Sequence, residues 1–169
     1  RGLYEPNFTG VDVVSRLRAR PGFAFQPPMM PLAHLFGSTR ATLPAEIPYP
    51  AADDGRVAKW RERLGAGFRI GIVWQGNPKY KRDRTRSFRP HAFGPLAAVP
   101  GVRLISLQTH GPADDLKTLP ATMQVETLGE EVVNNPDGFR EMAAVMANLD
   151  LLVTSDTGPA HLAGALGRP

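Results

Sequence analysis

The chain contains no cysteine and no long apolar run, and each absence removes a class of protein. Without cysteine there is no disulfide framework, no thiolate metal site and no cysteine nucleophile among its 169 residues. The longest apolar runs, such as Leu151 to Val153, fall far short of the ~20 residues that span a bilayer. A chain of this length can bury a sizeable hydrophobic core without disulfides or a structural metal. The length fits one full domain or two partial ones.

The first residues, Arg1 to Glu5, show no charged-then-apolar signal pattern and do not begin with methionine. We therefore expect a soluble, cytoplasmic chain that has been cut from a longer one. The last residues, Gly167 to Pro169, resemble the usual lead from a helix into a further strand, so we expect sequence to be missing there as well.

Positive charge is concentrated in one segment. Between Lys79 and Arg89 the only acid is Asp83, which gives this segment a net charge of +5, whereas the whole chain carries +4. A local cationic patch of this kind favours an anionic ligand over general polyanion binding. Its six bases are Lys79, Lys81, Arg82, Arg84, Arg86 and Arg89.

Proline divides the chain into two parts. Eight of the seventeen prolines lie in residues 1–55, a spacing that excludes long helices and interior strands there. We expect an irregular domain edge and linker, with a short helix over 29–36 ended by Gly37. A further helix over 55–64 should end at Gly65.

From residue 66 onward short apolar runs alternate with helical patterns, which predicts an α/β fold. The strand-helix order favours a Rossmann-like open, mostly parallel sheet. Strands are expected at 69–74, 102–107, 123–128 and 151–154, and helices at 90–99, 114–119, 139–149 and 159–166.

Two loops are candidate binding sites because each follows a strand, where open α/β sheets bind ligands. In the first, Gly76 would let the backbone approach a ligand closely, and the following cations would neutralise phosphate. The alternative is a solvated loop whose charge only aids solubility. The candidate residues of this loop are Gly76, Lys81, Arg84, Arg86 and Ser87.

The second loop opens the predicted helix at 159–166. Free N–H groups in the first turn of a helix form an anion site, and Pro159 suits that turn. Two alternatives stay open: Asp156 and Thr157 could simply cap the helix, and His161 could be an ordinary core histidine. A diphosphate bridging both loops is the economical interpretation. The candidates here are Asp156, Thr157, Gly158 and His161.

Several familiar sites are missing from the sequence. It has no P-loop and no Gly-x-Ser-x-Gly elbow, and its four histidines lack close metal-ligand spacing, so we predict no metal site. The acidic pairs at 114–115 and 130–131 are expected on solvated faces. Nucleic-acid binding is disfavoured because only Tyr80 and Phe88 in the basic segment could stack on bases.

Five segments together resemble a known family, the glycosyltransferase family 9-like modules of bacteria. Such modules often follow tetratricopeptide repeats and are related to the ADP-heptose heptosyltransferases. The resemblance covers roughly residues 25–169, including the stretches 36–39 and 43–49. The segments are 70–78 (IGIVWQGNP), 84–87 (RTRS), 106–108 (SLQ), 143–157 (AAVMANLDLLVTSDT) and 156–169 (DTGPAHLAGALGRP).

The resemblance implies part of a two-domain GT-B fold and a nucleotide-sugar donor as substrate. Residues 1–65 would be the end of an N-terminal domain with the interdomain linker, and residues 66–169 an incomplete nucleotide-sugar-binding domain. The donor diphosphate would be held by two groups of residues: Gly76, Lys81, Arg84, Arg86 and Ser87 of the first loop, and Asp156, Thr157 and Gly158 of the second. His161 would lie beside them. The resemblance implies no metal or other cofactor. The acceptor and catalytic residues stay unknown, because the family's N-terminal domain supplies them.

One position departs from the family: Thr109 stands where lysine is usual. A transferase fragment of this kind could be active or inactive by itself. The alternative is a non-catalytic nucleotide or sugar-phosphate binding module.

Overall fold

The computed structural model describes residues 3, 8, 10, 28, 31–109, 114–133 and 135–169. Most of residues 1–30 therefore lie outside the described residues, including the first residues of the helix expected at 29–36, and so does His110. Within the described part, that helix is α1 (Leu32–Leu35), and Gly37 follows it with φ of 61°.

A four-stranded parallel sheet forms the centre of the molecule, which confirms the predicted α/β class. The strands are β1 (Phe68–Val73), β2 (Val102–Ser106), β3 (Val125–Thr127) and β4 (Leu151–Thr154), in the order β3-β2-β1-β4. Ile70 of β1 lies opposite Leu104 on one side and Leu151 on the other. The chain thus builds outward from β1 in one direction and then places β4 on its other side.

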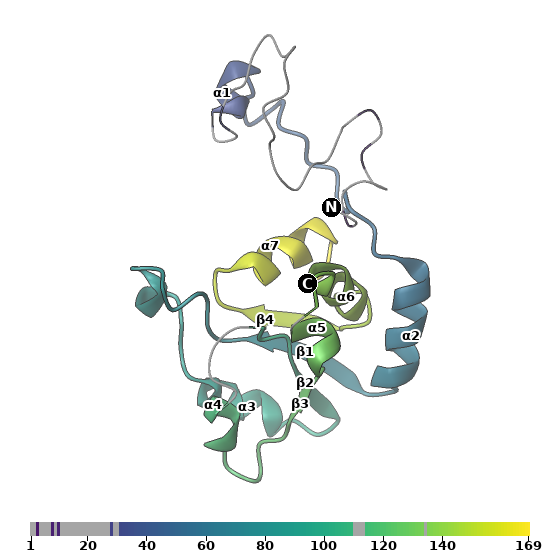
Figure 1. Cartoon of the computed structure of the whole chain (residues 1–169), viewed down its shortest axis with the longest axis vertical. Coiled ribbons are helices and arrows are strands. Elements are labelled where there is room, and N and C mark those ends of the chain that lie inside the picture. Colours follow the sequence, from purple (N-terminus) through teal and green to yellow (C-terminus); the bar gives the residue numbers. More distant parts are fainter. Residues whose placement is uncertain are drawn as a thin grey trace.

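The side chains of β1 alternate between the two faces of the sheet, as strand geometry requires. Ile70, Ile72 and Trp74 join one buried cluster, whereas Val73 joins the other. Each face is covered by helices, so the fold has three layers (Figure 1).

Helices α2 (Asp54–Leu64), α5 (Glu130–Val133), α6 (Gly138–Met146) and α7 (Gly158–Ala165) contribute to the cluster that contains Val73. The opposite cluster receives η3 (Pro90–Phe93), α3 (Gly94–Ala97) and α4 (Asp114–Lys117). A further short 3-10 helix, η2 (Asp83–Thr85), lies in the loop after β1. No helix within the described ranges has the length and apolar character needed to cross a bilayer.

Helix α2 is attached to α6 by polar contacts in the core. The Trp60 indole Nε1 donates to the buried Glu141 Oε2 at 2.6 Å, and Arg56 pairs with the same carboxylate. Asn148 Nδ2 donates to the carbonyl of Val57 at 3.0 Å. The helix starts where Asp53 accepts from Arg56 N, and it ends at Gly65 with φ of 63°, as the sequence predicts.

The helical predictions need revision at three points. The single helix expected at 90–99 is η3 followed by α3, because Pro95 has no N–H to continue a helix and suits a first turn instead. Helix α5 was not predicted. Phe139 has the helical spacing of a core residue, yet it is 57% exposed.

Candidate functional site

The strands β1, β2 and β4 end at one edge of the sheet, and a pocket of about 390 Å³ opens there. Because β2 and β4 lie on opposite sides of β1, this edge is the point where the strand order reverses, the usual ligand position in open α/β folds. The lining residues are Val73, Gln75, Gly76, Asn77, Arg86, Leu107, Gln108, Thr109, Val132, Val133, Asn135, Pro136, Gly138, Phe139, Met142, Thr157, Gly158 and Pro159.

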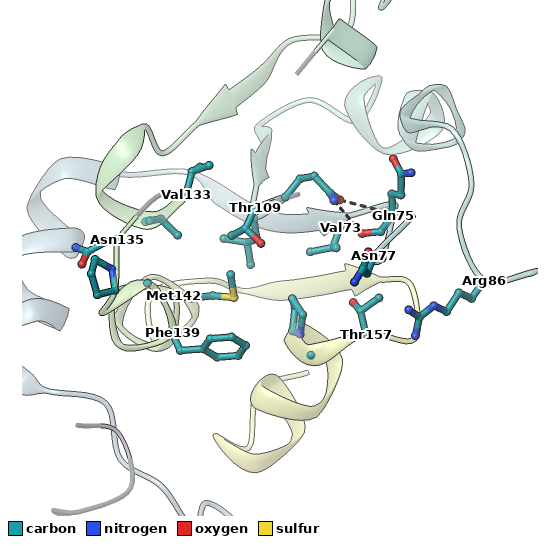
Figure 2. Close-up of a pocket in the computed structure, with 18 residues that line it drawn as sticks. Val73, Gln75, Asn77, Arg86, Thr109, Val133, Asn135, Phe139, Met142 and Thr157 are labelled. Carbon is teal, nitrogen blue, oxygen red and sulfur yellow. Dashed lines mark hydrogen bonds between the residues drawn. The ribbon is translucent and has the colours of Figure 1, made fainter. Parts of the chain in front are cut away.

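One glutamine fixes the end of β1 against the end of β2. Gln108 Oε1 accepts from the backbone N–H group of Trp74 at 3.2 Å. It also accepts from the N–H of Gln75 at 3.1 Å, and its Nε2 donates to the Gln75 carbonyl at 2.8 Å (Figure 2). The side chain of Gln108 therefore satisfies both N–H groups and a carbonyl of the backbone after β1, which fixes this part of the pocket before any ligand binds.

The loop after β1 leaves and returns at the same place, since Phe88 N donates to the Trp74 carbonyl at 2.9 Å. Inside it lies Asp83, only 4% exposed. Asp83 Oδ1 accepts from Arg86 Nε at 3.2 Å, and Asp83 Oδ2 accepts from Ser87 Oγ at 2.9 Å. Ser87 Oγ in turn accepts from Gly76 N at 3.1 Å, so one hydrogen-bonded chain runs through the loop.

Gly76 leaves room for the loop's own side chains. A Cβ at this position would lie 2.5 Å from Asp83 Oδ1 and 2.7 Å from Arg86 Nη2. The close approach permitted by glycine is thus made by Asp83 and Arg86, and the Gly76 N–H is already bonded to Ser87.

The loops after β1 and β4 meet at Arg86. Its Nη1 donates to the backbone carbonyl of Asp156 at 2.8 Å, and its guanidinium lies over the Tyr80 ring, 4.9 Å from the centroid. In Figure 2, Arg86, Asn77 and Thr157 lie together on one side of the pocket. The expected convergence of the two loops is therefore present.

The structure does not bring all nine candidates to the pocket. Gly76, Arg86, Thr157 and Gly158 line it, and Ser87 contacts it through Gly76. The exposed side chains of Lys81 and Arg84 are outside the lining.

Asp156 and His161 have exposed side chains, each 81% accessible, and their Oδ1 and Nε2 atoms are 3.9 Å apart. His161 lines a second pocket, of about 190 Å³, beside Tyr49 and Leu162. The core-histidine interpretation is therefore wrong for His161.

Helix α7 begins without a side-chain cap. Thr157 precedes its first residue, but Thr157 Oγ1 donates to the Ser155 carbonyl at 3.1 Å instead of accepting from the helix. The capping interpretation of Asp156 and Thr157 thus finds no hydrogen bond at this terminus. Because Thr157 and Gly158 line the pocket, the positive end of the helix dipole faces it.

The other side of the pocket is mostly apolar, with the amide of Asn135 as a polar exception. Val133, Phe139 and Met142 lie away from Arg86 in Figure 2, and the buried side chains of Leu107 and Val132 continue this wall. Sequence reasoning missed Phe139 as a pocket residue, because its spacing is equally typical of a core residue. It also missed Asp83, whose signal was its isolation among six bases.

No cluster of three or more His, Asp or Glu side chains that could hold a metal ion occurs in the described part of the chain. The pocket is instead lined by amides, one guanidinium, hydroxyls and apolar groups. Such a lining suits a ligand with one anionic and one apolar end.

Comparisons with known proteins agree with this architecture. Protein FlbA of Caulobacter vibrioides is 31% identical over 149 residues, which make up 86% of this chain and 24% of FlbA. The chain therefore spans about a quarter of the length of this curated relative.

The fold is similar to a solved structure, that of E. coli ADP-heptose lps heptosyltransferase II, with a TM-score of 0.52. The match covers 76% of this chain and 40% of the heptosyltransferase chain. At 18% identity this likeness concerns the fold. Residues 104–169 match the family model described as Glycosyltransferase family 9 (heptosyltransferase). In this region the chain is thus similar to glycosyltransferase family 9, on a fold that matches part of a GT-B heptosyltransferase.

Proposed function

We propose that this chain is the donor-binding part of a glycosyltransferase, and that its pocket holds the diphosphate of a nucleotide sugar. The observation that carries the proposal is the position of Arg86, which joins the two loops beside the uncapped start of α7. The family match of residues 104–169 supports sugar transfer as the reaction.

The polar side of the pocket has the groups that a diphosphate requires. Arg86 offers a guanidinium edge, and Thr157 and Gly158 stand at the start of α7, where backbone N–H groups favour anions. These groups would also stabilise the nucleoside diphosphate that departs when the sugar is transferred. Ser87 and Gly76 would support them from behind, through their mutual hydrogen bond.

The remaining candidates would act at longer range. Lys81 and Arg84 extend the positive field of the loop, which raises the local concentration of an anionic donor. Asp156 contributes its backbone carbonyl to Arg86. His161 lines the second pocket, so it would influence the diphosphate only through its position near Asp156.

The apolar side would receive the nucleoside. A volume of about 390 Å³ falls within the range of small-molecule sites, roughly 300–1,000 Å³. Phe139 and Met142 provide an aromatic and a thioether surface suited to a flat base.

A melting-temperature series with ADP, UDP and inorganic pyrophosphate tests the proposal. A ligand at 100 times its Kd should stabilise the chain by about 2.7 kcal/mol, and the double variant Arg84→Ala/Arg86→Ala should lose this shift. Trp74 fluorescence is a poor reporter, because its side chain lies in the cluster on the opposite face of the sheet.

Lys117→Ala removes an exposed cation from α4 and is the control, for which the shift should stay unchanged. Absence of a shift with every nucleoside diphosphate would overturn the proposal.

A non-catalytic nucleotide or sugar-phosphate binding module is the second candidate. The observation in its favour is that no Asp, Glu or His side chain is among the described residues that line the pocket. Release of nucleoside diphosphate from a nucleotide sugar with a supplied acceptor distinguishes a transferase from a module that only binds.

A further inference from the structure

We infer that Asp83 is a positioning residue, which sets the guanidinium of Arg86 so that one nitrogen remains for a bound phosphate. The inference rests on the proposed diphosphate site and assigns a task to a buried acid that this site does not itself use.

The burial of Asp83 sets it apart from every other charge in its loop. Its side chain is 6% exposed, whereas Lys81, Arg82 and Arg84 beside it are exposed. A buried carboxylate is unfavourable unless hydrogen bonds and an opposite charge compensate for lost hydration. Ser87 and Arg86 supply both, so the loop folds around this acid.

Arg86 has little freedom left once these contacts are made. Asp83 occupies its Nε, the carbonyl of Asp156 occupies its Nη1, and the ring of Tyr80 lies against its face. Among the described residues, Nη2 has no hydrogen-bond acceptor. Since Arg86 lines the pocket, we assign Nη2, which keeps both of its N–H groups, as the nitrogen that donates to a ligand there.

Fixing a long side chain in advance lowers the entropy lost when it binds. The side chains of Lys81 and Arg84 are not fixed in this way, because neither forms an ion pair within the described part of the chain. Asp83 thereby selects which of six neighbouring cations acts at short range, and it raises affinity without touching the ligand.

A double-mutant cycle on the full chain tests this, with the Kd of ADP measured by calorimetry. Asp83→Asn keeps the shape but removes the charge, and we expect about tenfold weaker binding. In an Arg86→Ala background the same substitution should change the Kd by less than about twofold. Asp114→Asn is the matched control, because its exposed carboxylate pairs with Lys117 three residues on.

Equal losses in the two backgrounds would overturn the inference, since a role confined to folding would not depend on Arg86. If Asp83→Asn does not fold, Asp83→Glu replaces it in the same cycle with the same criteria. Glutamate keeps the charge but moves the carboxylate one methylene further from the backbone.

A second measurement needs no ligand. In ¹⁵N spectra, the Nε–H signal of Arg86, assigned by its loss in Arg86→Lys, should exchange slowly with water in the original chain and in Asp114→Asn. Asp83→Ala, which removes the acceptor of this N–H, should abolish the protection, and an unchanged signal would overturn the inference. If no nucleoside diphosphate binds, the proposed function fails while this measurement still decides the role of Asp83.

Discussion

The two loops that meet at the pocket are stabilised by different kinds of contact. The loop after β1 is long and basic, and its structure depends on a buried carboxylate bonded to Arg86 and Ser87. The loop after β4 is short and runs directly into α7, with the side chains of Asp156 and His161 exposed to solvent.

The difference shows how side chains and backbone can share one task. In the first loop, hydrogen bonds to Asp83 and to the Asp156 carbonyl orient the guanidinium of Arg86, which we propose prepares it for an anionic ligand. In the second, the start of a helix presents backbone N–H groups whose direction the helix itself fixes. Substitutions should therefore damage the first loop far more readily than the second.

The largest effect is expected from Gly76→Ala. A methyl group 2.5 Å from Asp83 Oδ1 must displace the buried carboxylate, and such overpacking typically costs about 1–3 kcal/mol. Chemical denaturation measures the loss. Gly164→Ala in α7 is the control, because nothing lies within 4 Å of its added methyl, and it should raise stability by up to about 1 kcal/mol. Similar losses at both positions would contradict the comparison.

Phe139→Ala should have an intermediate effect, and on affinity alone. Its ring is 57% exposed and lines the apolar side of the pocket, so we expect roughly fivefold weaker binding of ADP, about 1 kcal/mol. Binding of inorganic pyrophosphate should be unchanged, because that ligand has no base. Calorimetry with both ligands checks this, and an equal loss for both would show that Phe139 supports the polar side instead.

The smallest effect is expected from Asp156→Ala. The side chain is 81% exposed and caps no helix, while the group that holds Arg86 is the backbone carbonyl, which alanine retains. The free energy of unfolding should change by less than about 0.5 kcal/mol, as for other surface substitutions. A large drop in melting temperature without ligand would restore a structural role for this carboxylate.

The sequence was informative wherever a local pattern had one structural meaning. The β-branched run around Ile70 and Ile72 indicated a buried strand, which is β1, and Gly65 marked the end of α2. Patterns with two meanings failed. Helical spacing did not distinguish the pocket-lining Phe139 from core residues. The isolation of Asp83 among six bases was a signal, but it is equally typical of a solvated loop, and Asp83 is in fact buried.

The placement of side chains across the pocket depends on contacts between distant segments, such as that of Arg86 with residue 156, which no local pattern encodes. The cytoplasmic location, the division at residue 65 and the association with tetratricopeptide repeats stay predictions.

The hydrogen bond from Phe88 N to the Trp74 carbonyl has a consequence for engineering and for divergence. A segment whose ends adjoin, and whose buried side chains bond mainly to one another, can be exchanged as a unit, provided that Arg86 keeps its hydrogen bond to the Asp156 carbonyl. Its solvent-facing lysines and arginines are then free to drift, or to be redesigned for another anion, so long as the buried acid and its two partners travel together.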